Sequence, residues 1–432
     1  MKQLQPPKGT RDIVYEEAAA RRKVIDRLRR CFLDFGFSDF DTPAFEHLET
    51  LEQKSGPDVT DQIYTLEDKG GRKLGLIFEF TASLGRAAAN NADLIRPFKR
   101  YQIGKVWRYE RPQANRYREF YQADIDILGP YTMDCEVEIL LAVSHVLNSF
   151  GLAEFEFLLN DRKVLRGQLE AAGIEDEKDQ MAVLRGLDKA DKISPDEVRA
   201  YILEQGVSAE RYELFMALVP TQGSNAEILG ALETGLVASE RGREGVAELR
   251  QILALAEGCD LARRIRLAPF LVRGLDYYTG PVFEVRCPTL GNVSFGGGGR
   301  YDTMVEMFGG RPAGAAGFAF GVERLVSILM QEKLVTGAKS EARIMVTPRV
   351  PELALEAFRL SEELRAAGLA VYQFLGKEKI ARQFSFAAKM GFPFVTVVGE
   401  QEVASGVFRL KNMASEEEAL VPRAELAARL LS

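Results

Sequence analysis

The chain has 432 residues, more than one ordinary core holds, and its 46% hydrophobic and 28% charged content is typical of soluble globular proteins. No apolar run approaches the ~20 residues of a membrane helix and the N-terminus shows no apolar signal region, so we expect a cytosolic protein. The chain has only two histidines and four widely spaced cysteines, which argues against most histidine-based catalysis, zinc binding and disulfide formation. The net charge of −7 gives no support to nucleic-acid binding, which usually shows as an excess of basic residues.

The first predicted element is an amphipathic helix over residues 16–35, where hydrophobic residues recur at helical spacing between arginines. Gly36 follows as its stop, and residues 37–43 indicate an extended segment. Residues 101–107 and 120–128 then alternate in a strand-like way. They predict the two arms of a long antiparallel hairpin.

A helix is predicted over residues 134–150, and from about 160 to 262 the sequence is helical and charged, with few strand signals. We interpret that stretch as a helical insertion. Strand and glycine-rich character returns at 266–300, and residues 317–330 indicate a glycine entering an amphipathic helix. Residues 333–342 are typical of a linker.

After the linker the pattern alternates between strand and helix, which predicts a small α/β domain. The predicted strands cover residues 343–347, 370–374 and 394–398, and the predicted helices cover 352–367, 380–390 and 423–431. The changes of texture along the chain divide it into four parts: 1–159, 160–262, 263–332 and 342–432.

The connection of the predicted hairpin is rich in arginine. It carries Arg108, Arg111, Arg116 and Arg118, with Glu110 among them and Glu119 directly after them. A guanidinium group can donate two hydrogen bonds at once to phosphate oxygens, so this loop indicates a triphosphate ligand. A solvated loop held by salt bridges is an open alternative. Along the next strand, Gln122, Asp124 and Asp126 alternate with apolar residues, which places all three on one face.

Two segments late in the chain carry the strongest functional signal. Residues 271–284 contain Arg273, Tyr277 and Tyr278 beside a glycine, and residues 294–302 contain a run of four glycines that ends in an arginine. Glycine weakens a strand interior, so such a run indicates the close approach of a ligand or another backbone. The alternative interpretation is a flexible hairpin turn.

Two single side chains add to this picture. Glu79 stands among aromatic residues before a helix, where it is either a helix-terminal carboxylate or an anchor for a substrate ammonium. Arg324 lies near the start of an apolar helix, a place that the helix dipole disfavours for a cation. A nearby anionic ligand explains that position better than solvent does.

Taken together, these segments resemble the class II aminoacyl-tRNA synthetases, and among them the histidyl-tRNA synthetase family. The similar segments, in chain order, are Pro7–Asp12, Gly36–Pro43, Arg108–Gly129, residues 271–284, residues 294–302 and Gly317–Arg324. Gly36–Pro43, Arg108–Gly129 and Gly317–Arg324 resemble the three class II motifs, and the other two late segments resemble those specific to the histidine enzymes. Asp126 stands where bacterial members usually have glutamate and is similar to the archaeal and eukaryotic branch.

The resemblance implies an α+β fold in which an antiparallel-sheet catalytic domain with a helical insertion precedes a C-terminal α/β anticodon-binding domain. It assigns residues 1–159 and 263–332 to the catalytic domain, 160–262 to the insertion and 342–432 to anticodon binding. The implied activity is ATP-dependent activation of L-histidine to histidyl-adenylate and transfer to the 3′ end of tRNA(His). Implied partners are tRNA(His), histidine, ATP with Mg²⁺, whose ligands the sequence does not identify, and a second copy in a homodimer.

The resemblance also implies roles for single residues. Catalysis would rest on Arg108 and Arg273, and ATP binding on Arg108, Glu110, Arg116 and Arg324. Histidine binding would involve Glu79, Thr81, Arg108, Gln122, Asp126, Arg273, Tyr277 and Tyr278. Gln113 would approach the tRNA acceptor end.

Two other functions remain open from the sequence. One is the non-catalytic regulatory paralogue that pairs with ATP phosphoribosyltransferase, which typically lacks the C-terminal domain. The other is a class II synthetase for another amino acid, such as proline, threonine or glycine. The retained arginines and the C-terminal α/β segment argue against the first, and residues 273–278 argue against the second.

Overall fold

The computed structural model describes residues 4–53, 60–111, 117–189, 193–272 and 277–431. Contacts divide the chain into a large unit, residues 1–12 and 24–335, and a small unit, residues 13–23 and 336–432. Each unit is described by itself. The predicted helical insertion belongs to the large unit, so these two units do not decide the four-part division, which stays a prediction.

The large unit is built on a sheet with strand order β1-β5-β6-β11-β10-β9-β7-β8. In that order the bounds are Ser38–Asp39, Phe98–Trp107, Glu119–Gly129, Gly314–Gly321, Val293–Arg300, Pro281–Cys287, Glu156–Asp161 and Ile265–Leu267. Neighbours from β5 to β7 are antiparallel, and only the outermost pairs, β1 with β5 and β7 with β8, run parallel. The predicted antiparallel-sheet fold class is confirmed.

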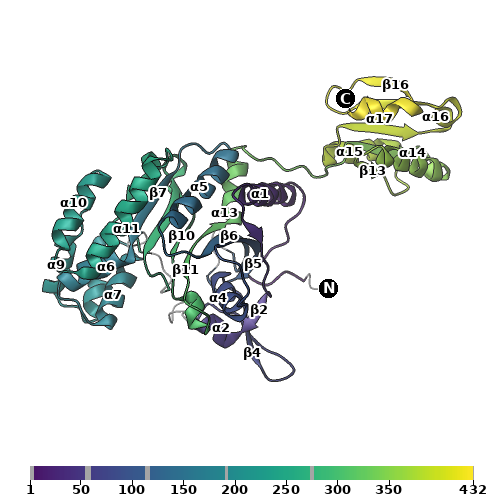
Figure 1. Ribbon diagram of the computed structural model, residues 1–432. Helices are drawn as coiled ribbons and strands as arrows, with labels where there is room; N and C mark the ends of the chain where they lie inside the picture. Colours follow the sequence, from purple (N-terminus) through teal and green to yellow (C-terminus); the bar gives the residue numbers. More distant parts are fainter. Residues whose placement is uncertain (1–3, 54–59, 112–116, 190–192, 273–276, 432) are drawn as a thin grey trace. The chain divides into compact units, whose positions relative to one another are not determined.

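The predicted hairpin is confirmed as β5 and β6, whose register runs from Phe98 opposite Leu128 to Trp107 opposite Glu119. Apolar positions of the hairpin such as Val106, Ala123 and Ile125 are buried, and helices cover one face of the sheet. On one side lie α5 (Asp134–Ser149) and α13 (Val322–Gln331), which contact β6 and β11 (Figure 1). The alternation seen in the sequence therefore reflects packing between layers.

The four-glycine run is not a turn. It forms the end of strand β10, between β9 and β11. A Cβ on Gly298 would lie 1.8 Å from the carbonyl oxygen of Gly317, and one on Gly296 would lie 2.1 Å from that of Ala319. The expected close approach is therefore that of another backbone, and the flexible-hairpin alternative was wrong.

The expected helix entry at Gly317 was also wrong in part. Residues 314–321 form strand β11, and the helix α13 begins only at Val322. The physical reason is lateral pairing, because β11 hydrogen-bonds to β6 on one side and β10 on the other. Phe318 and Phe320 are buried there.

Smaller elements complete this part of the large unit. They are helix α1 (Tyr15–Asp34) from residue 24 on, the helices α2 (Leu48–Glu52), α4 (Thr81–Asn90) and α12 (Met304–Met307), the 3₁₀ turn Pro288–Leu290, and a sheet of β2 (Phe45–His47), β4 (Lys73–Leu76) and β3 (Thr65–Glu67). The first predicted helix is thus confirmed, and Gly36 follows it with φ +72°, a left-handed conformation that favours glycine.

Helices α6 to α11 gather at one end of the sheet, beyond β7 (Figure 1). Their bounds are Arg162–Ala171, Glu177–Leu187, Pro195–Glu204, Ala209–Leu218, Asn225–Gly235 and Glu240–Glu257, and a 3₁₀ turn at Ala262–Arg264 follows. Ser194 and Ser224 form capping boxes with Glu197 and Glu227. These caps satisfy helix-terminal N–H groups, so their positions are set by local sequence.

The small unit contains a sheet of order β13-β12-β14-β15-β16. The strands are Val371–Gln373, Ile344–Pro348, Phe394–Val398, Val407–Asn412 and Glu418–Pro422, and the helices are α14 (Ala354–Ala366), α15 (Ile380–Met390), α16 (Glu400–Ser405) and α17 (Leu426–Leu431), with 3₁₀ turns at Pro351–Leu353 and Arg423–Glu425. The first three strands are parallel and were predicted. The antiparallel strands β15 and β16 and the helix α16 were missed.

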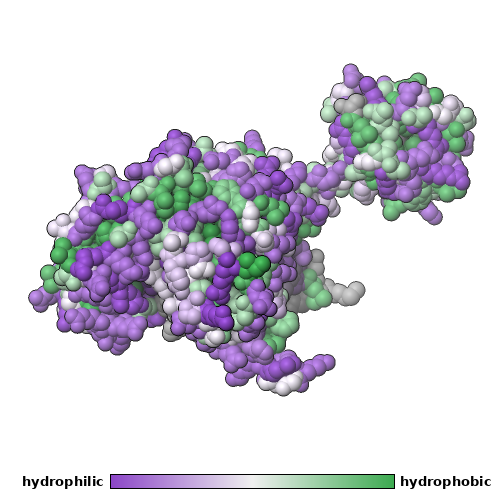
Figure 2. Space-filling view, in the orientation of Figure 1, coloured by the Kyte–Doolittle hydropathy of each residue, from purple (hydrophilic) through white to green (hydrophobic). Residues whose placement is uncertain are grey.

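Most of the visible surface is hydrophilic, with hydrophobic residues in separate groups (Figure 2). The large hydrophobic side chains accordingly concentrate in the interior, where Phe32, Phe157 and Phe283 have no exposed surface. Among the helices of the described residues, none is both long and apolar enough to span a membrane.

Candidate active site

A cavity of about 680 Å³ lies over the strands β6, β9, β10 and β11 of the large sheet. Its polar and aromatic lining comes from segments far apart in the sequence. The lining includes Gln62, Phe78, Glu79, Thr81, Arg108, Glu110, Tyr117, Phe120, Gln122, Asp124, Asp188, Tyr277, Tyr278, Glu284, Arg286, Ser294, Glu323 and Arg324. A volume of this size suits a ligand larger than one amino acid.

Arg108, just beyond the end of β5, is held in a fixed orientation. Its Nε donates to the carbonyl oxygen of Phe78 at 3.0 Å, and its Nη2 donates to Oε1 of Gln122 at 3.1 Å. The guanidinium also lies over the ring of Phe120, 5.2 Å from the centroid. Burial lowers the pKa of Arg108, and the carboxylates of Glu110 and Glu79 oppose that shift. It stays a cation at neutral pH and is aimed at the cavity.

Glu79 is 3% exposed and lies at the start of helix α4. Its carboxylate accepts backbone N–H bonds from Thr81 and Ala82, the latter at 2.8 Å. The interpretation as a helix-terminal carboxylate is therefore correct. Because Glu79 also lines the cavity, the same group presents negative charge to a ligand.

The polar face of β6 forms part of the floor. Gln122 links the hairpin to this face, because it accepts from Arg108 and its Nε2 donates to Oδ1 of Asp124 at 3.3 Å. Asp124 lines the cavity and is 4% exposed. Desolvation raises the pKa of Asp124 well above its ordinary value, Asp126 and Glu79 add to this, and Arg100 and Arg108 oppose it.

Asp126 lies on the same face but is not among the residues that line the cavity. It pairs with Arg100 of β5 at 2.6 Å, and the Tyr301 hydroxyl donates to its Oδ1. Arg100 has no exposed surface, and burial raises the pKa of Asp126. The structure therefore places Asp124, not Asp126, at the cavity surface, and Asp126 is covered by its partners Arg100 and Tyr301.

Tyr277 and Tyr278 form the aromatic wall. Their ring centroids are 4.8 Å apart, and Tyr277 also meets Tyr301 edge-on at 5.7 Å. Burial raises the pKa of Tyr277 well above its ordinary value, so the phenol remains protonated at neutral pH. Gly296 and Gly297 lie on the adjoining floor, so that backbone atoms face the cavity there.

The start of helix α13 also lies at the cavity. Glu323 accepts from the backbone N–H of Tyr121 at 2.7 Å, which ties the helix to β6. Arg324 donates to the carbonyl oxygen of Ser294 at 2.9 Å. The expected arginine near a helix start therefore does reach the cavity.

Arg300, which ends the glycine run, does not belong to the site. It is 1% exposed, and its Nε and Nη2 each donate at 2.7 Å to the carboxylate of Glu136 in α5. It also donates to the carbonyl oxygen of Thr132 at 2.9 Å. This arginine joins the sheet to its covering helix α5.

Eight of the predicted site residues line one cavity: Glu79, Thr81, Arg108, Glu110, Gln122, Tyr277, Tyr278 and Arg324. Gln113, Arg116 and Arg273 lie outside the described residues. The roles of all these residues stay predictions. What the structure adds is that four separate segments bring their side chains to the same place.

Several lining residues were missed as candidates, among them Asp124, Asp188, Glu284, Arg286 and Glu323. Asp124 had a usable signal, since it shares a strand face with Gln122. Glu284 and Arg286 also stand two apart in an apolar strand, where they form an ion pair. For Asp188 the sequence offers no signal, because only the packing of the helices brings it to the cavity.

The arrangement has a definite chemical character. Arg108, Arg286 and Arg324 supply cationic groups for phosphate or carboxylate oxygens. Glu79 and Asp124 supply acidic groups for an ammonium or an N–H donor. Within the described residues, no group of three or more His, Cys, Asp or Glu side chains is arranged to hold a metal ion. The site is thus suited to aligning two polar substrates by electrostatics.

Comparison with protein families gives matches to nearly the whole chain. Residues 9–325 match the model of histidyl-tRNA synthetase, and residues 343–432 match the model of an anticodon binding domain. The histidine–tRNA ligase of Thermococcus kodakarensis is 33% identical over 436 residues, covering 100% of this chain and 99% of the relative. That of Aeropyrum pernix is 36% identical and covers 98% of this chain and 96% of the relative.

Solved structures show the same similarity. The crystal structure of histidyl-tRNA synthetase from Nostoc sp. PCC 7120 has a TM-score of 0.82 and 28% identity, and the match covers 100% of this chain and 99% of the other. The similarity extends over the sequence of both units.

Proposed function

The chain belongs to the histidyl-tRNA synthetase family, and we propose that the cavity is where histidine and ATP react. The protein charges tRNA with histidine: it activates L-histidine with ATP and transfers the aminoacyl group to the tRNA 3′ end. One observation carries the proposal for the cavity, namely that cationic, acidic and aromatic side chains from four segments line a single space.

The two alternative functions are not favoured. Full-length relatives that share about a third of their residues with this chain are histidine–tRNA ligases. A regulatory paralogue typically lacks a C-terminal domain, whereas residues 343–432 match an anticodon binding domain. The match of residues 9–325 to the histidyl-tRNA synthetase family argues against a synthetase for another amino acid.

We infer that Arg108 binds the α-phosphate of ATP and the carboxylate of histidine. In the reaction a carboxylate oxygen attacks the α-phosphorus and pyrophosphate leaves, which requires alignment and a cationic surround but no protein nucleophile. Arg108 is suited to this because Phe78 and Gln122 already fix its orientation. Arg273, outside the described residues, is proposed to neutralise charge on the same phosphate.

The histidine α-ammonium is assigned to Glu79, Thr81 and Gln122. Both oxygens of Glu79 accept backbone N–H bonds, which holds the carboxylate against the cavity without neutralising it. A carboxylate that is fixed in this way binds a cation with little loss of side-chain freedom. Thr81 and Gln122 line the same part of the cavity and offer hydroxyl and amide oxygens.

The imidazole is assigned to Tyr277, Tyr278 and the acidic face of β6. Asp126 keeps its proposed role as an acidic group, acting from beneath the surface through its bonds to Arg100 and Tyr301. Asp124 is the carboxylate at the surface itself. Buried polar partners such as these reject side chains that cannot pair with them.

ATP is assigned to Glu110 and Arg324 together with Arg116, and the acceptor end of tRNA to Gln113, the last two lying outside the described residues. We propose that Mg²⁺ enters with the ATP phosphates, where it would neutralise charge. We further propose that residues 342–432 bind the anticodon, that the protein works as a homodimer, and that it acts in the cytoplasm.

The deciding experiment is ATP–pyrophosphate exchange with the purified protein, run separately with each of the twenty amino acids. Exchange with histidine alone is the expected result. Exchange with another amino acid, or with none in a folded protein that binds histidine, would overturn the assignment. Deletion of residues 342–432 is expected to spare exchange and weaken tRNA charging, and equal charging would remove the anticodon role.

A further inference from the structure

A short segment joins the helical insertion to the cavity. Phe270, Leu271 and Val272 all line the cavity, and residues 273–276, which follow, lie outside the described residues. The wall is described again from Tyr277. The placement of residues 270–272 therefore bears directly on the geometry of the proposed histidine site.

Strand β7 holds this segment through a buried amide. Asn160, 2% exposed, donates from Nδ2 to the carbonyl oxygens of Pro269 and Leu271 at 3.0 and 3.1 Å. The backbone N–H of Ala268 donates to Leu159 at 2.8 Å. The segment up to Leu271 is thus fixed to the sheet, and its conformation does not depend on the insertion alone.

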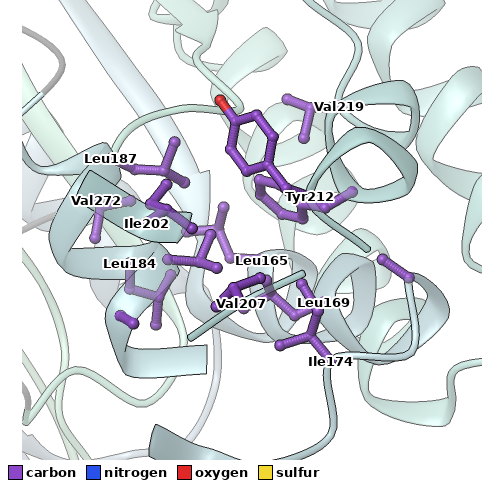
Figure 3. Packing of buried hydrophobic residues seen from close by; sticks show 14 of the residues in the cluster. Leu165, Leu169, Ile174, Leu184, Leu187, Ile202, Val207, Tyr212, Val219 and Val272 are labelled. Atoms are coloured by element: carbon purple, nitrogen blue, oxygen red, sulfur yellow. The ribbon is translucent and has the colours of Figure 1, made fainter. Parts of the chain in front are cut away.

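Leu271 and Val272 are adjacent in sequence but pack into different cores. Leu271 packs with Leu158 and Val282, which belong to the sheet. Val272 packs instead into the hydrophobic core of the insertion, whose other buried members come from residues 165–219. In Figure 3, Val272 lies at one edge of that cluster, beside Leu184 and Leu187.

The insertion also reaches the cavity from the other direction. Leu187, at the end of α7, is a member of the same core and lines the cavity, as does Asp188, the C-cap residue of that helix. One wall of the cavity is therefore continuous with the interior of the insertion. Closely packed interiors transmit small displacements, because they contain few voids that could absorb them.

We propose that Val272 is a positioning residue, through which the core of the insertion sets the rate of histidine activation even when no tRNA is present. This inference rests on the proposed function of the cavity. Val272 does not need to touch a substrate. It anchors residues 270–272, which line the cavity beside the insertion core, and reactions between aligned substrates are sensitive to shifts of about 1 Å.

The test compares two identical truncations within one core. Val272→Ala removes the anchor at the cavity, and Val219→Ala removes the same atoms at the opposite edge of the cluster (Figure 3), where the side chain is 4% exposed. Histidine-dependent pyrophosphate exchange is measured without tRNA, with kcat and KM determined separately, alongside urea unfolding of each variant.

We expect Val272→Ala to lower kcat for exchange by about 10- to 100-fold, with a smaller change in KM for ATP. Val219→Ala is expected to exchange like the unmodified protein while losing a similar free energy of unfolding. Val272→Ile should restore most of the rate. Equal exchange by the two alanine variants would overturn the inference.

Two controls keep the result interpretable. If Val272→Ala does not fold, the pair Val272→Thr and Val219→Thr is compared in the same way, because each variant keeps the side-chain shape but buries a hydroxyl in place of a methyl group. The unmodified protein is assayed first, because its failure to exchange histidine would refute the proposed function. A loss shared by both variants of a pair would refute only the role of Val272.

Discussion

The floor of the cavity and the core of the insertion are built from opposite materials. At and beneath the cavity floor, Arg100, Asp124 and Asp126 are at most 4% exposed, so the sheet buries ionisable side chains. The insertion core consists of buried aliphatic and aromatic side chains such as Leu165 and Phe215. Buried charge is costly even when paired, whereas buried apolar surface is the main source of folding free energy.

This difference teaches where function has displaced stability. Desolvation raises the pKa of Asp124 and Asp126, so the sheet keeps carboxylates that are destabilising as ions. The core cluster of the predicted insertion is aliphatic and aromatic, and capping boxes close two of its helices. Its buried carboxylate of raised pKa, Asp161 at the N-cap of α6, lies outside that cluster. The two regions meet at Leu271 and Val272, which makes that junction the place where stability and activity are coupled.

The largest expected effect comes from a substitution in the insertion core. Phe215→Ala removes a fully buried ring from the insertion core and should lower the free energy of unfolding by about 3–5 kcal/mol. Urea unfolding followed by circular dichroism measures it. A loss below about 1 kcal/mol would mean that this core is not closely packed.

The matching test on the cavity is the substitution Arg108→Ala, which removes a cationic group from the proposed substrate site. Losing one oriented charge partner should lower histidine-dependent exchange by about 10²–10³-fold, because the α-phosphate and carboxylate lose their donor. The free energy of unfolding should change far less than in Phe215→Ala. Near-normal exchange in a folded variant would remove Arg108 from its proposed role.

Asp124→Asn sharpens the comparison through pH. The pKa of Asp124 in the folded state lies well above its ordinary value of 3.8. Ionisation of Asp124 therefore destabilises the folded state as the pH rises from 3.8 through the folded-state pKa. The asparagine variant should therefore match the unmodified protein in acid and gain about 1–3 kcal/mol of stability at neutral pH.

Urea unfolding at several pH values between 4 and 8 tests this prediction, with histidine exchange measured in parallel. Exchange should fall although stability rises, because the carboxylate at the cavity surface is lost. A variant that is less stable at neutral pH would show that Asp124 contributes net stability through Arg100 and Gln122.

The smallest expected effect concerns the local signals of the insertion. Ser194→Ala removes the capping hydrogen bond to the N–H of Glu197 and should cost about 1 kcal/mol of unfolding free energy. Ser208→Ala, at a cap that lacks the reciprocal glutamate bond, serves as the matched variant and should cost no more. Exchange is expected to stay unchanged, and a fall in exchange would mean that the cap acts on the cavity.

Much of the site was predictable because its signals are local. Period-two alternation identified the hairpin of β5 and β6 and the shared face of Gln122 and Asp124, and the position before a helix identified Glu79. Each of these patterns depends on neighbours within a few residues. The resemblance of the segments to a known family then supplied roles that periodicity alone does not contain.

Other features were not predictable from local patterns. The sequence places Arg300 beside the glycine run, but only the packing of α5 turns it to Glu136. The strands β15 and β16 depend on pairing with β14. Nothing near Asp188 in the sequence indicates that the end of α7 would line the cavity.

The sequence by itself determined many of the helices, the hairpin of β5 and β6, the parallel strands of the small unit, eight of the residues that line the cavity and the family. These follow from side-chain periodicity, capping residues and motif order, which act over short distances along the chain. Only the tertiary structure decided how deep each polar group lies and which core each neighbour joins, as with Asp124 above Asp126 and Leu271 beside Val272. Depth and partner choice depend on contacts between segments far apart in sequence, and short-range patterns do not encode those contacts.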